Sequence, residues 1–217
     1  MGQPGNAGLQ ALYRSVMEGN REEAASQARQ LLATRTDPGK MVEEGLVPAI
    51  HQVGELWEQG DYFLPQLMQS AEAMKAAMAV VNPALRAAGK TRTTLGKAVI
   101  GTVAGDIHDI GKSLVATMMS ASGFFVIDLG ADVPLAKFVE TARKENAQLV
   151  MMSALLTTTM TGQRIVVEML KAAGLQGKVK VMVGGCPVSE AWAREIGADG
   201  FADNAVQAVR TAKKLLE

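Results

Sequence analysis

The stretch Gly-Asp-Ile-His-Asp-Ile-Gly at residues 105–111 follows the short apolar run 97–103 and leads into a segment with helical spacing. Three further apolar runs, 124–128, 149–152 and 179–183, each precede a helix-like segment, and a last short strand and helix lie near Gly200 and over 206–216. Short apolar strands that alternate with amphipathic helices form a parallel sheet covered on both faces. This half of the chain therefore predicts an α/β domain of the flavodoxin-like (Rossmann-like), doubly wound class.

The residues before this stretch have a different character, because residues 8–88 contain no convincing strand. Apolar residues recur there at helical spacing in four segments, each with a single apolar stripe. Asp37 and Pro38 suit the N-cap and first turn of the third segment, and Gly60 breaks the chain before the fourth. The pattern predicts an all-α, antiparallel four-helix bundle. With a polar linker at 89–95, we expect a helical domain over 1–90 and an α/β domain over 91–217.

Composition argues against several classes of partner. The 22 Lys and Arg residues balance the 22 Asp and Glu residues, so no net field would attract nucleic acid or an anionic membrane. The single cysteine, Cys186, excludes an internal disulfide and suits a reducing compartment. No apolar run approaches the roughly 18 residues of a membrane helix, and the N-terminus lacks a signal-peptide pattern. We therefore expect a cytoplasmic protein that binds neither nucleic acid nor membrane.

Three loops of the α/β half have unusual sequences. In doubly wound sheets, ligands bind beyond the carboxyl ends of the strands, where the strand order reverses. The loops expected there are 105–111, then Ser-Ala-Leu-Leu-Thr-Thr-Thr at 153–159, then Gly-Gly-Cys-Pro at 184–187. Small side chains and glycines predict a deep slot for a long non-peptide group. We interpret Cys186 as a small buried residue.

His108 is one of only two histidines and lies in the first of these loops. A neutral imidazole is a good cobalt ligand when its second ring nitrogen has an acceptor, and Asp106 is placed to be that acceptor. Thr159, from the neighbouring loop, could donate to the carboxylate in turn, which would complete a relay for a proton. On spacing alone, a surface histidine beside a helix N-terminus fits equally well.

Two other interpretations of this region fail on spacing. Gly105 to Lys112 resembles a phosphate-binding loop, and the strand that ends at Asp128 resembles a magnesium-binding strand. The phosphate-binding pattern has four residues between its glycines, whereas five separate Gly105 from Gly111. An inserted His-Asp pair would also place negative charge where phosphate should sit. Two histidines and one cysteine far apart argue against a zinc site.

The loop residues resemble the signature of the base-off/His-on cobalamin-binding domain: Asp106-x-His108-x-x-Gly111, then Ser153-x-Leu155, then Gly184-Gly185. The helical half is similar to the helical cap of methionine synthase at Gly54-Glu55-Leu56-Trp57, Phe63-Leu64-Pro65-Gln66, Ser70-Ala71 and Met74-Lys75. Both modules occur in order and span nearly the whole chain. A free-standing pair of this kind resembles the small corrinoid methyl-carrier proteins of methyltransferase systems.

The resemblance implies a cobalamin or related corrinoid cofactor and a role for each matching residue. His108 would be the lower cobalt ligand, in place of the cofactor's dimethylbenzimidazole, with Asp106 and Thr159 behind it. The cofactor's tail would thread into the slot. In the cap, Trp57 and Leu64 would cover the methyl face with Leu67 close by, although core packing is the alternative for all three. The remaining cofactor-binding residues implied are Ile107, Asp109, Ile110, Gly111, Ser153, Leu155, Thr157, Gly184 and Gly185.

The implied function is a methyl shuttle that is not catalytic alone. A substrate-specific methyltransferase of the methylamine, methanol, betaine or methoxy-aromatic type would load the methyl group. A second methyltransferase would pass it to a thiol or folate acceptor, and a corrinoid reactivase is a further partner that the resemblance allows. Because a covered cobalt cannot be reached by a partner, the cap must move, and we expect the linker 89–95 to be the hinge.

Three alternatives remain open at this point. A cobalamin-dependent sensor would need an output domain, and residues 1–90 carry 8 Lys and Arg against 10 Asp and Glu, which argues against a DNA-binding module. The small subunit of a carbon-skeleton mutase shares the loop signature but normally lacks the helical cap. A detached methionine synthase module shares both parts. The sequence does not identify the methyl donor or acceptor.

Overall fold

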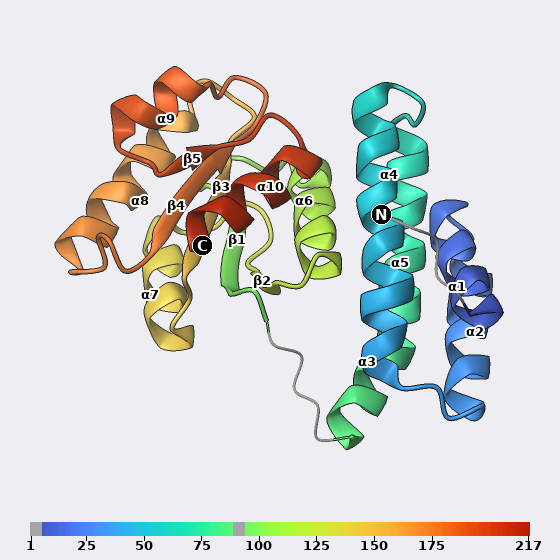
Figure 1. The fold of residues 1–217 in the computed structure, drawn as a ribbon. Coiled ribbons are helices and arrows are strands. Elements are labelled where there is room, and N and C mark those ends of the chain that lie inside the picture. Colours follow the sequence, from blue (N-terminus) through green and yellow to red (C-terminus); the bar gives the residue numbers. More distant parts are fainter. Residues whose placement is uncertain (1–5, 89–93) are drawn as a thin grey trace. The chain divides into compact units, whose positions relative to one another are not determined.

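The computed structural model describes residues 6–88 and 94–217, and the chain divides into two compact units, 1–93 and 94–217. We describe each unit by itself (Figure 1). Most of the predicted hinge, residues 89–93, lies outside the described residues. Among the described helices, none is both long and apolar enough to cross a membrane.

The first unit is built from helices throughout its described residues. They are α1 (Ala7–Met17), α2 (Arg21–Ala33), α3 (Pro38–Lys40), the π-helical segment η1 (Met41–Leu46), α4 (Val47–Gln59) and α5 (Leu64–Ala87). Asp37 caps α3 as predicted, since its carboxylate accepts the Gly39 amide at 2.8 Å. The apolar stripes meet in a core that includes Leu12, Met41, Ile50 and Met74. Four helical stretches thus form the expected bundle.

The third stretch departs from a regular α-helix. From Pro38 to Gln59 the chain is helical without interruption, but the six residues Met41–Leu46 have π-helical hydrogen bonding. Such a segment places one extra residue in a turn and shifts the side chains that follow it. Gly60, with φ +83°, adopts the left-handed conformation that ends α4. The helical spacing of the sequence predicted the helix and its end but not the π segment.

The second unit is a five-stranded parallel sheet with the order β2-β1-β3-β4-β5, the flavodoxin-like topology that the sequence predicted. Its strands are β1 (Lys97–Thr102), β2 (Phe125–Asp128), β3 (Leu149–Ser153), β4 (Lys180–Gly184) and β5 (Gly200–Phe201). Its helices are α6 (Ile110–Ala121), α7 (Leu135–Glu145), α8 (Met160–Ala172), α9 (Glu190–Ile196) and α10 (Ala205–Leu216). The four strands predicted with bounds begin and end within one residue of the observed bounds, and the fifth lies at Gly200, where a short strand was expected.

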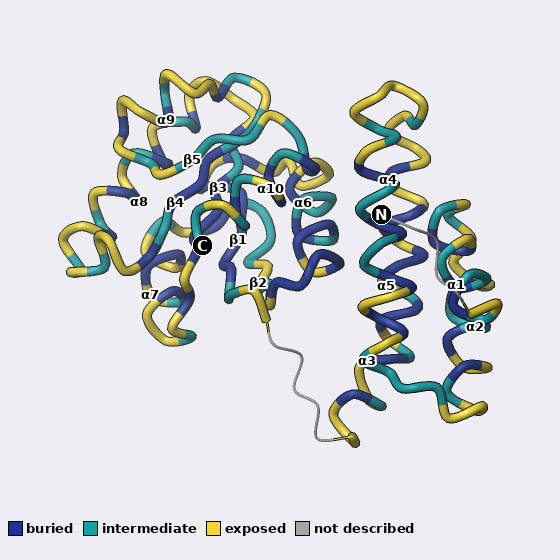
Figure 2. Tube along the Cα trace, viewed as in Figure 1, coloured by how far each residue is buried: buried dark blue, intermediate teal, exposed yellow. Residues whose placement is uncertain are grey.

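The three central strands are buried, as the dark tube in Figure 2 shows. On one face, α7, α8 and α9 cover a core of Val99, Phe138, Val150, Val166 and Val183, among others. Strand register places the last residues of β1, β3 and β4, namely Thr102, Ser153 and Gly184, side by side. The loops that follow these strands therefore start from one line at the carboxyl edge of the sheet.

Candidate functional site

The site lies where the strand order reverses. From β1 the chain crosses through α6 to β2 on one side, whereas β3 pairs with the other side of β1. The loops after β1 and β3 therefore diverge above the sheet, which is where ligands enter this class of fold. A single buried side chain, Asp106, joins the two loops.

Asp106 is fully buried and binds donors from both loops. Its Oδ1 accepts the His108 amide at 3.1 Å and lies 2.7 Å from His108 Nδ1. Its Oδ2 accepts the Thr159 hydroxyl at 2.8 Å and the Leu155 and Leu156 amides at 2.6 and 3.3 Å. The His-Asp-Thr chain that the sequence predicted is therefore present as a set of hydrogen bonds.

The charge of Asp106 decides the state of the imidazole. Burial acts to raise the pKa of this carboxyl, but hydrogen bonds from the Leu155 amide, from His108 and from Thr159 outweigh it and hold the pKa well below its usual range. The carboxylate is then an acceptor only, so the proton of a neutral imidazole sits on Nδ1. That leaves the lone pair of Nε2 free for a metal.

His108 stands among exposed apolar side chains. The side chain of His108 is 47% exposed. Ile107, beside it in the loop, is 78% exposed, and Ile110, the first residue of α6, is 69% exposed. Leu155 and Leu156, whose amides bind Asp106, are exposed as well. Water leaves such surfaces when an apolar partner covers them. The surroundings of Nε2 therefore suit a ligand that brings a large apolar face to the histidine.

Two residues outside the predicted set hold the turn in place. The hydroxyl of Thr102 donates to the backbone oxygen of His108 at 2.8 Å. Asp132 lies in the loop after β2. Its carboxylate accepts the Gly105 amide at 2.7 Å, and its backbone amide donates to the backbone oxygen of Asp106 at 2.9 Å. Asp132 has φ +51°, a conformation that only a few per cent of non-glycine residues adopt. The turn is thus fastened at both ends by the body of the domain.

The glycines of the loops have different reasons to be glycine. A Cβ at Gly185, where φ is +120°, would lie 1.8 Å from the Ala154 oxygen, and one at Gly184 would lie 2.8 Å from the Ala202 oxygen. The protein's own backbone therefore requires both. A Cβ at Gly111 would meet no described atom within 4 Å. The absence of a side chain at Gly111 leaves open space beside the His108 turn that an external group can enter.

Lys112 and Asp128, the two residues that gave the turn its likeness to a nucleotide site, bind each other. Lys112 Nζ lies 2.7 and 2.6 Å from the two carboxylate oxygens of Asp128, and its side chain is only 3% exposed. A lysine held in this way is not available to a phosphate. The rejection of a phosphate-binding loop therefore has a structural reason.

The other predicted residues of this unit lie around the same edge. Ser153 ends β3, Thr157 is exposed in the next loop, and Asp109 directly precedes α6. Our interpretation of Cys186 as a buried residue was wrong, because its side chain is exposed. It lies in a turn closed by the Val188 amide, which donates to the Gly185 oxygen at 2.9 Å. The turn carries Cys186 outward from the end of β4.

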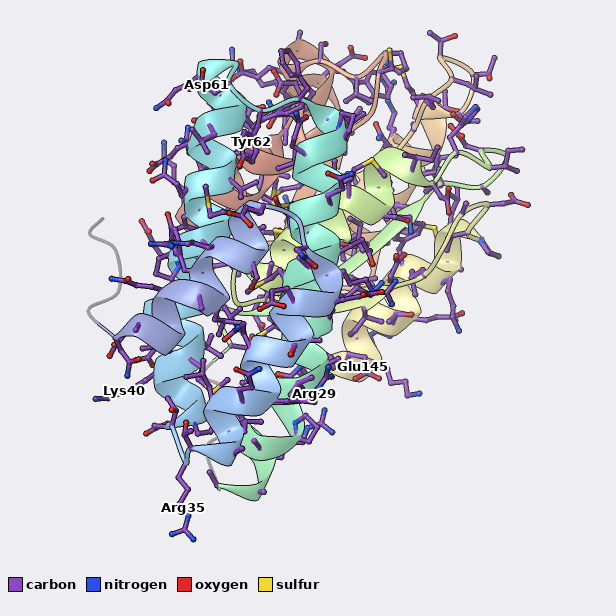
Figure 3. The ribbon with its side chains drawn as sticks, turned by 90° about the vertical axis from the view of Figure 1, so that its right-hand side faces the viewer. Arg29, Arg35, Lys40, Asp61, Tyr62 and Glu145 are labelled. Carbon is purple, nitrogen blue, oxygen red and sulfur yellow. The ribbon has the colours of Figure 1, made fainter. Side chains whose placement is uncertain are left out.

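The predicted cap residues lie near one end of the helical unit. Figure 3 labels Asp61 and Tyr62 there, and Arg35 and Lys40 at the other end. Leu64 is exposed, Trp57 is half-buried, and Leu67 is only 1% exposed, inside the bundle core. Leu67 is therefore placed to support this surface from beneath. Two exposed apolar neighbours, Phe63 and Met68, were not among the predicted cofactor-contacting residues.

Comparison with known proteins agrees with this geometry. Residues 96–210 match a family described as a B12 binding domain, and residues 9–82 match a second family with that description. The chain is 49% identical over 193 residues to "Dimethylamine corrinoid protein 2" of Methanosarcina mazei, which covers 89% of this chain and 88% of the relative. It is 45% identical over 195 residues to "Trimethylamine corrinoid protein 1" of the same organism, with 90% of each covered.

A solved structure resembles the whole chain. It is the methanol:cobalamin methyltransferase complex MtaBC from Methanosarcina barkeri, with a TM-score of 0.87 and 27% identity over 99% of this chain and 81% of that one. The family match over residues 96–210 includes all three loops of the site, 105–111, 153–159 and 184–187. These findings support a corrinoid cofactor and a carrier within a methyltransferase system.

Proposed function

The chain belongs to the B12-binding family of corrinoid proteins, and from this premise we propose that it carries methyl groups on a corrinoid whose lower ligand is His108. The observation that carries the proposal is the hydrogen-bonded chain from His108 through Asp106 to Thr159. It orients the imidazole, fixes the proton on Nδ1 and leaves Nε2 facing outward.

The residues around His108 fit a corrinoid. Ile107 and Ile110 would cover part of its macrocycle, and the space beside Gly111 would admit the displaced tail. Ser153, Thr157 and Gly184 would line the tail's path along the ends of β3 and β4, together with Gly185. When bound, the corrinoid supplies a cobalt centre that accepts and releases a methyl group. The protein supplies the ligand and its orientation.

The relay gives these residues a further task, which is to manage one proton. If Nε2 of His108 held the cofactor's metal, Asp106 would hold the Nδ1 proton of the ring through the 2.7 Å hydrogen bond. With no metal on Nε2, that nitrogen would be the ring atom open to a proton. Thr159, buried and bonded to the other carboxylate oxygen, stabilises the charge of Asp106 in both states.

We propose a methylamine as the source of the methyl group. Relatives that cover about nine tenths of the chain are named dimethylamine and trimethylamine corrinoid proteins, with 49% and 45% identity. The partners would be a methyltransferase that demethylates the amine and a second that uses the methyl group, with a reactivase as a further partner. The same proposal includes a cytoplasmic location and motion of the helical unit about residues 89–95. It also includes coverage of the methyl face by Trp57 and Leu64.

The test of the ligand is the visible spectrum of cobalamin-loaded protein. Wild type and His51→Ala should both show the spectrum of imidazole-ligated cobalamin. His108→Ala should lack this spectrum, whether or not it still retains the coloured cofactor. His51 is the matched control because it is the other histidine and lies on α4. Identical spectra for wild type and His108→Ala would contradict the proposal.

The test of the substrate is a transfer assay. Protein loaded with cobalamin and reduced chemically to the Co(I) state is incubated with monomethylamine, dimethylamine, trimethylamine or methanol and the methyltransferase specific for that substrate. Loss of the substrate and formation of methyl-Co(III) are measured. We expect transfer with a methylamine enzyme. Transfer from methanol alone would overturn the substrate assignment and leave the carrier function standing.

A further inference from the structure

We propose that Thr102 is a positioning residue for the His108 imidazole, because its buried hydroxyl fixes the backbone from which the ring projects. The inference rests on the proposed role of His108 as a metal ligand. It adds that the strength of ligation is set partly by a residue of β1 that contacts neither the metal nor the ring. Nothing in the loop sequence 105–111 itself reveals this residue.

Thr102 is a rigid base for such a contact. It is the last residue of β1, pairs with Ser153 of β3 and is fully buried. The backbone amide of Thr102 donates to the backbone oxygen of Gly130 at 3.0 Å, and the backbone oxygen of Thr102 accepts the Val133 amide at 3.0 Å. A hydroxyl buried among apolar residues costs free energy unless it is bonded. Here the bond goes to the His108 oxygen at 2.8 Å.

His108 depends on this contact because little else holds it. Its amide and its Nδ1 both bind one oxygen of Asp106, so without Thr102 the described bonds hold its amino side and ring only. The ring is 47% exposed and its neighbours Ile107 and Ile110 point outward, so side-chain packing around it is sparse. The bond from Thr102 to the carbonyl fixes the other side of the residue. The direction of Nε2 is then determined before a ligand arrives.

Asp132 divides this work with Thr102. It fastens the amino end of the turn, through the Gly105 amide and the Asp106 oxygen, whereas Thr102 fastens the carboxyl end at His108. Only the contact from Thr102 is made to His108, the residue whose ring is the proposed metal ligand. Loss of the Thr102 hydroxyl should therefore loosen the imidazole while leaving the Asp106 network in place.

The experiment compares Thr102→Val, which keeps the shape and loses the hydroxyl, with Thr102→Ser, which keeps the hydroxyl and loses a methyl group. Each protein is loaded with cyanocobalamin and titrated with cyanide, which displaces the lower ligand and changes the visible spectrum. We expect the cyanide concentration at half displacement to fall about fivefold to tenfold in Thr102→Val, as for the loss of one hydrogen bond. Thr102→Ser should stay near wild type.

If Thr102 acted only through packing, Thr102→Ser would be less stable than Thr102→Val, and neither variant would change the cyanide midpoint. Chemical denaturation of the same proteins separates the two, since the lost methyl group makes Thr102→Ser the variant with the packing defect. An unchanged midpoint in folded Thr102→Val, or equal shifts in both variants, would overturn the inference. Should Thr102→Val fail to fold, Thr102→Cys replaces it, because a thiol is a weak donor of similar size to serine.

Failure of the proposed function is distinguishable from failure of this inference. In the same titration, cyanide should bind the lower face of the cofactor in His108→Ala at a far lower concentration than in wild type. If His108→Ala and wild type behave alike, the imidazole is not the ligand and the proposed function is at fault. If they differ while Thr102→Val matches wild type, only the role of Thr102 is refuted.

Discussion

The two units hold their predicted ligand residues in opposite ways. In the α/β unit, Asp106 lies at the centre of hydrogen bonds that also join the loops after β1 and β3, so the candidate site is part of the fold. In the helical unit, Leu64 and Phe63 are exposed at a turn, which Tyr62 ties to α1 through a 3.0 Å bond to the Met17 oxygen. Changes at Asp106 or at the glycines after β4 should therefore alter stability and function together, whereas changes at the exposed helical turn should affect function alone.

The largest effect should come from Gly185→Ala. The new Cβ would lie 1.8 Å from the Ala154 oxygen at φ +120°, so the ends of β3 and β4 would have to separate. We expect a loss of about 3 kcal/mol or more in the free energy of unfolding, measured by chemical denaturation. Gly177→Ala is the control, since φ is +77° there but no described atom lies within 4 Å. It should cost only about 1 kcal/mol, and equal costs would contradict the close approach.

A second pair of variants tests the helical unit. Leu67→Ala should cost about 3 kcal/mol because Leu67 is buried in the bundle core, whereas Leu64→Ala should cost less than about 0.5 kcal/mol. The two leucines are three residues apart on α5, which makes them a matched pair. Thermal or chemical unfolding measures both. If Leu64→Ala were as damaging as Leu67→Ala, the exposed turn would be part of the core and the contrast between the units would fail.

Asp106→Asn should cost about 2 kcal/mol at neutral pH, because an amide cannot accept all the hydrogen bonds that the carboxylate accepts. The pKa of Asp106 is lowered in the folded state, so its stabilisation is complete above the unfolded-state pKa of about 3.9 and is lost as pH falls below it. The difference between wild type and variant should therefore narrow from pH 7 to pH 3. Asp61→Asn, an exposed change in the helical turn, is the control for loss of a carboxylate outside this network, and it should change the free energy of unfolding at neutral pH by less than about 0.5 kcal/mol.

Within the α/β unit, the smallest effect on stability should come from His108→Ala. The side chain is half-exposed, and Asp106 keeps the Leu155, Leu156 and Thr159 donors when the ring is removed. We expect a change of less than about 1 kcal/mol in the free energy of unfolding. A loss comparable with that of Asp106→Asn would show that His108 is a structural residue, which would weaken its assignment as a ligand.

Sequence reasoning succeeded where a local pattern determines the structure. Apolar runs and helical spacing gave the strands and the sheet class, and the Asp106–His108 spacing with Thr159 gave the hydrogen-bonded chain. These features depend on the period of side chains along one element or on loops that must leave the same sheet edge. The resemblance to a corrinoid family then supplied the cofactor, which the family match supports.

The features that were missed depend on contacts between distant segments. Thr102 matters because strand register brings it beneath the carbonyl of His108, and Asp132 because a loop 27 residues beyond Gly105 folds back over the turn. The exposure of Cys186 follows from the turn after β4. No pattern along the sequence encodes these contacts, although an isolated Thr at the end of an apolar strand is a signal that could have been followed.

The most direct measurement of the central claim is electron paramagnetic resonance of the protein loaded with cob(II)alamin after growth on ¹⁵N-labelled histidine. In the His51→Ala background, His108 is the only labelled residue. Ligation through Nε2 should split each cobalt line into a doublet, where unlabelled protein gives a triplet. A triplet that persists after labelling would show that the cofactor's own base remains the lower ligand, and this result would contradict the account.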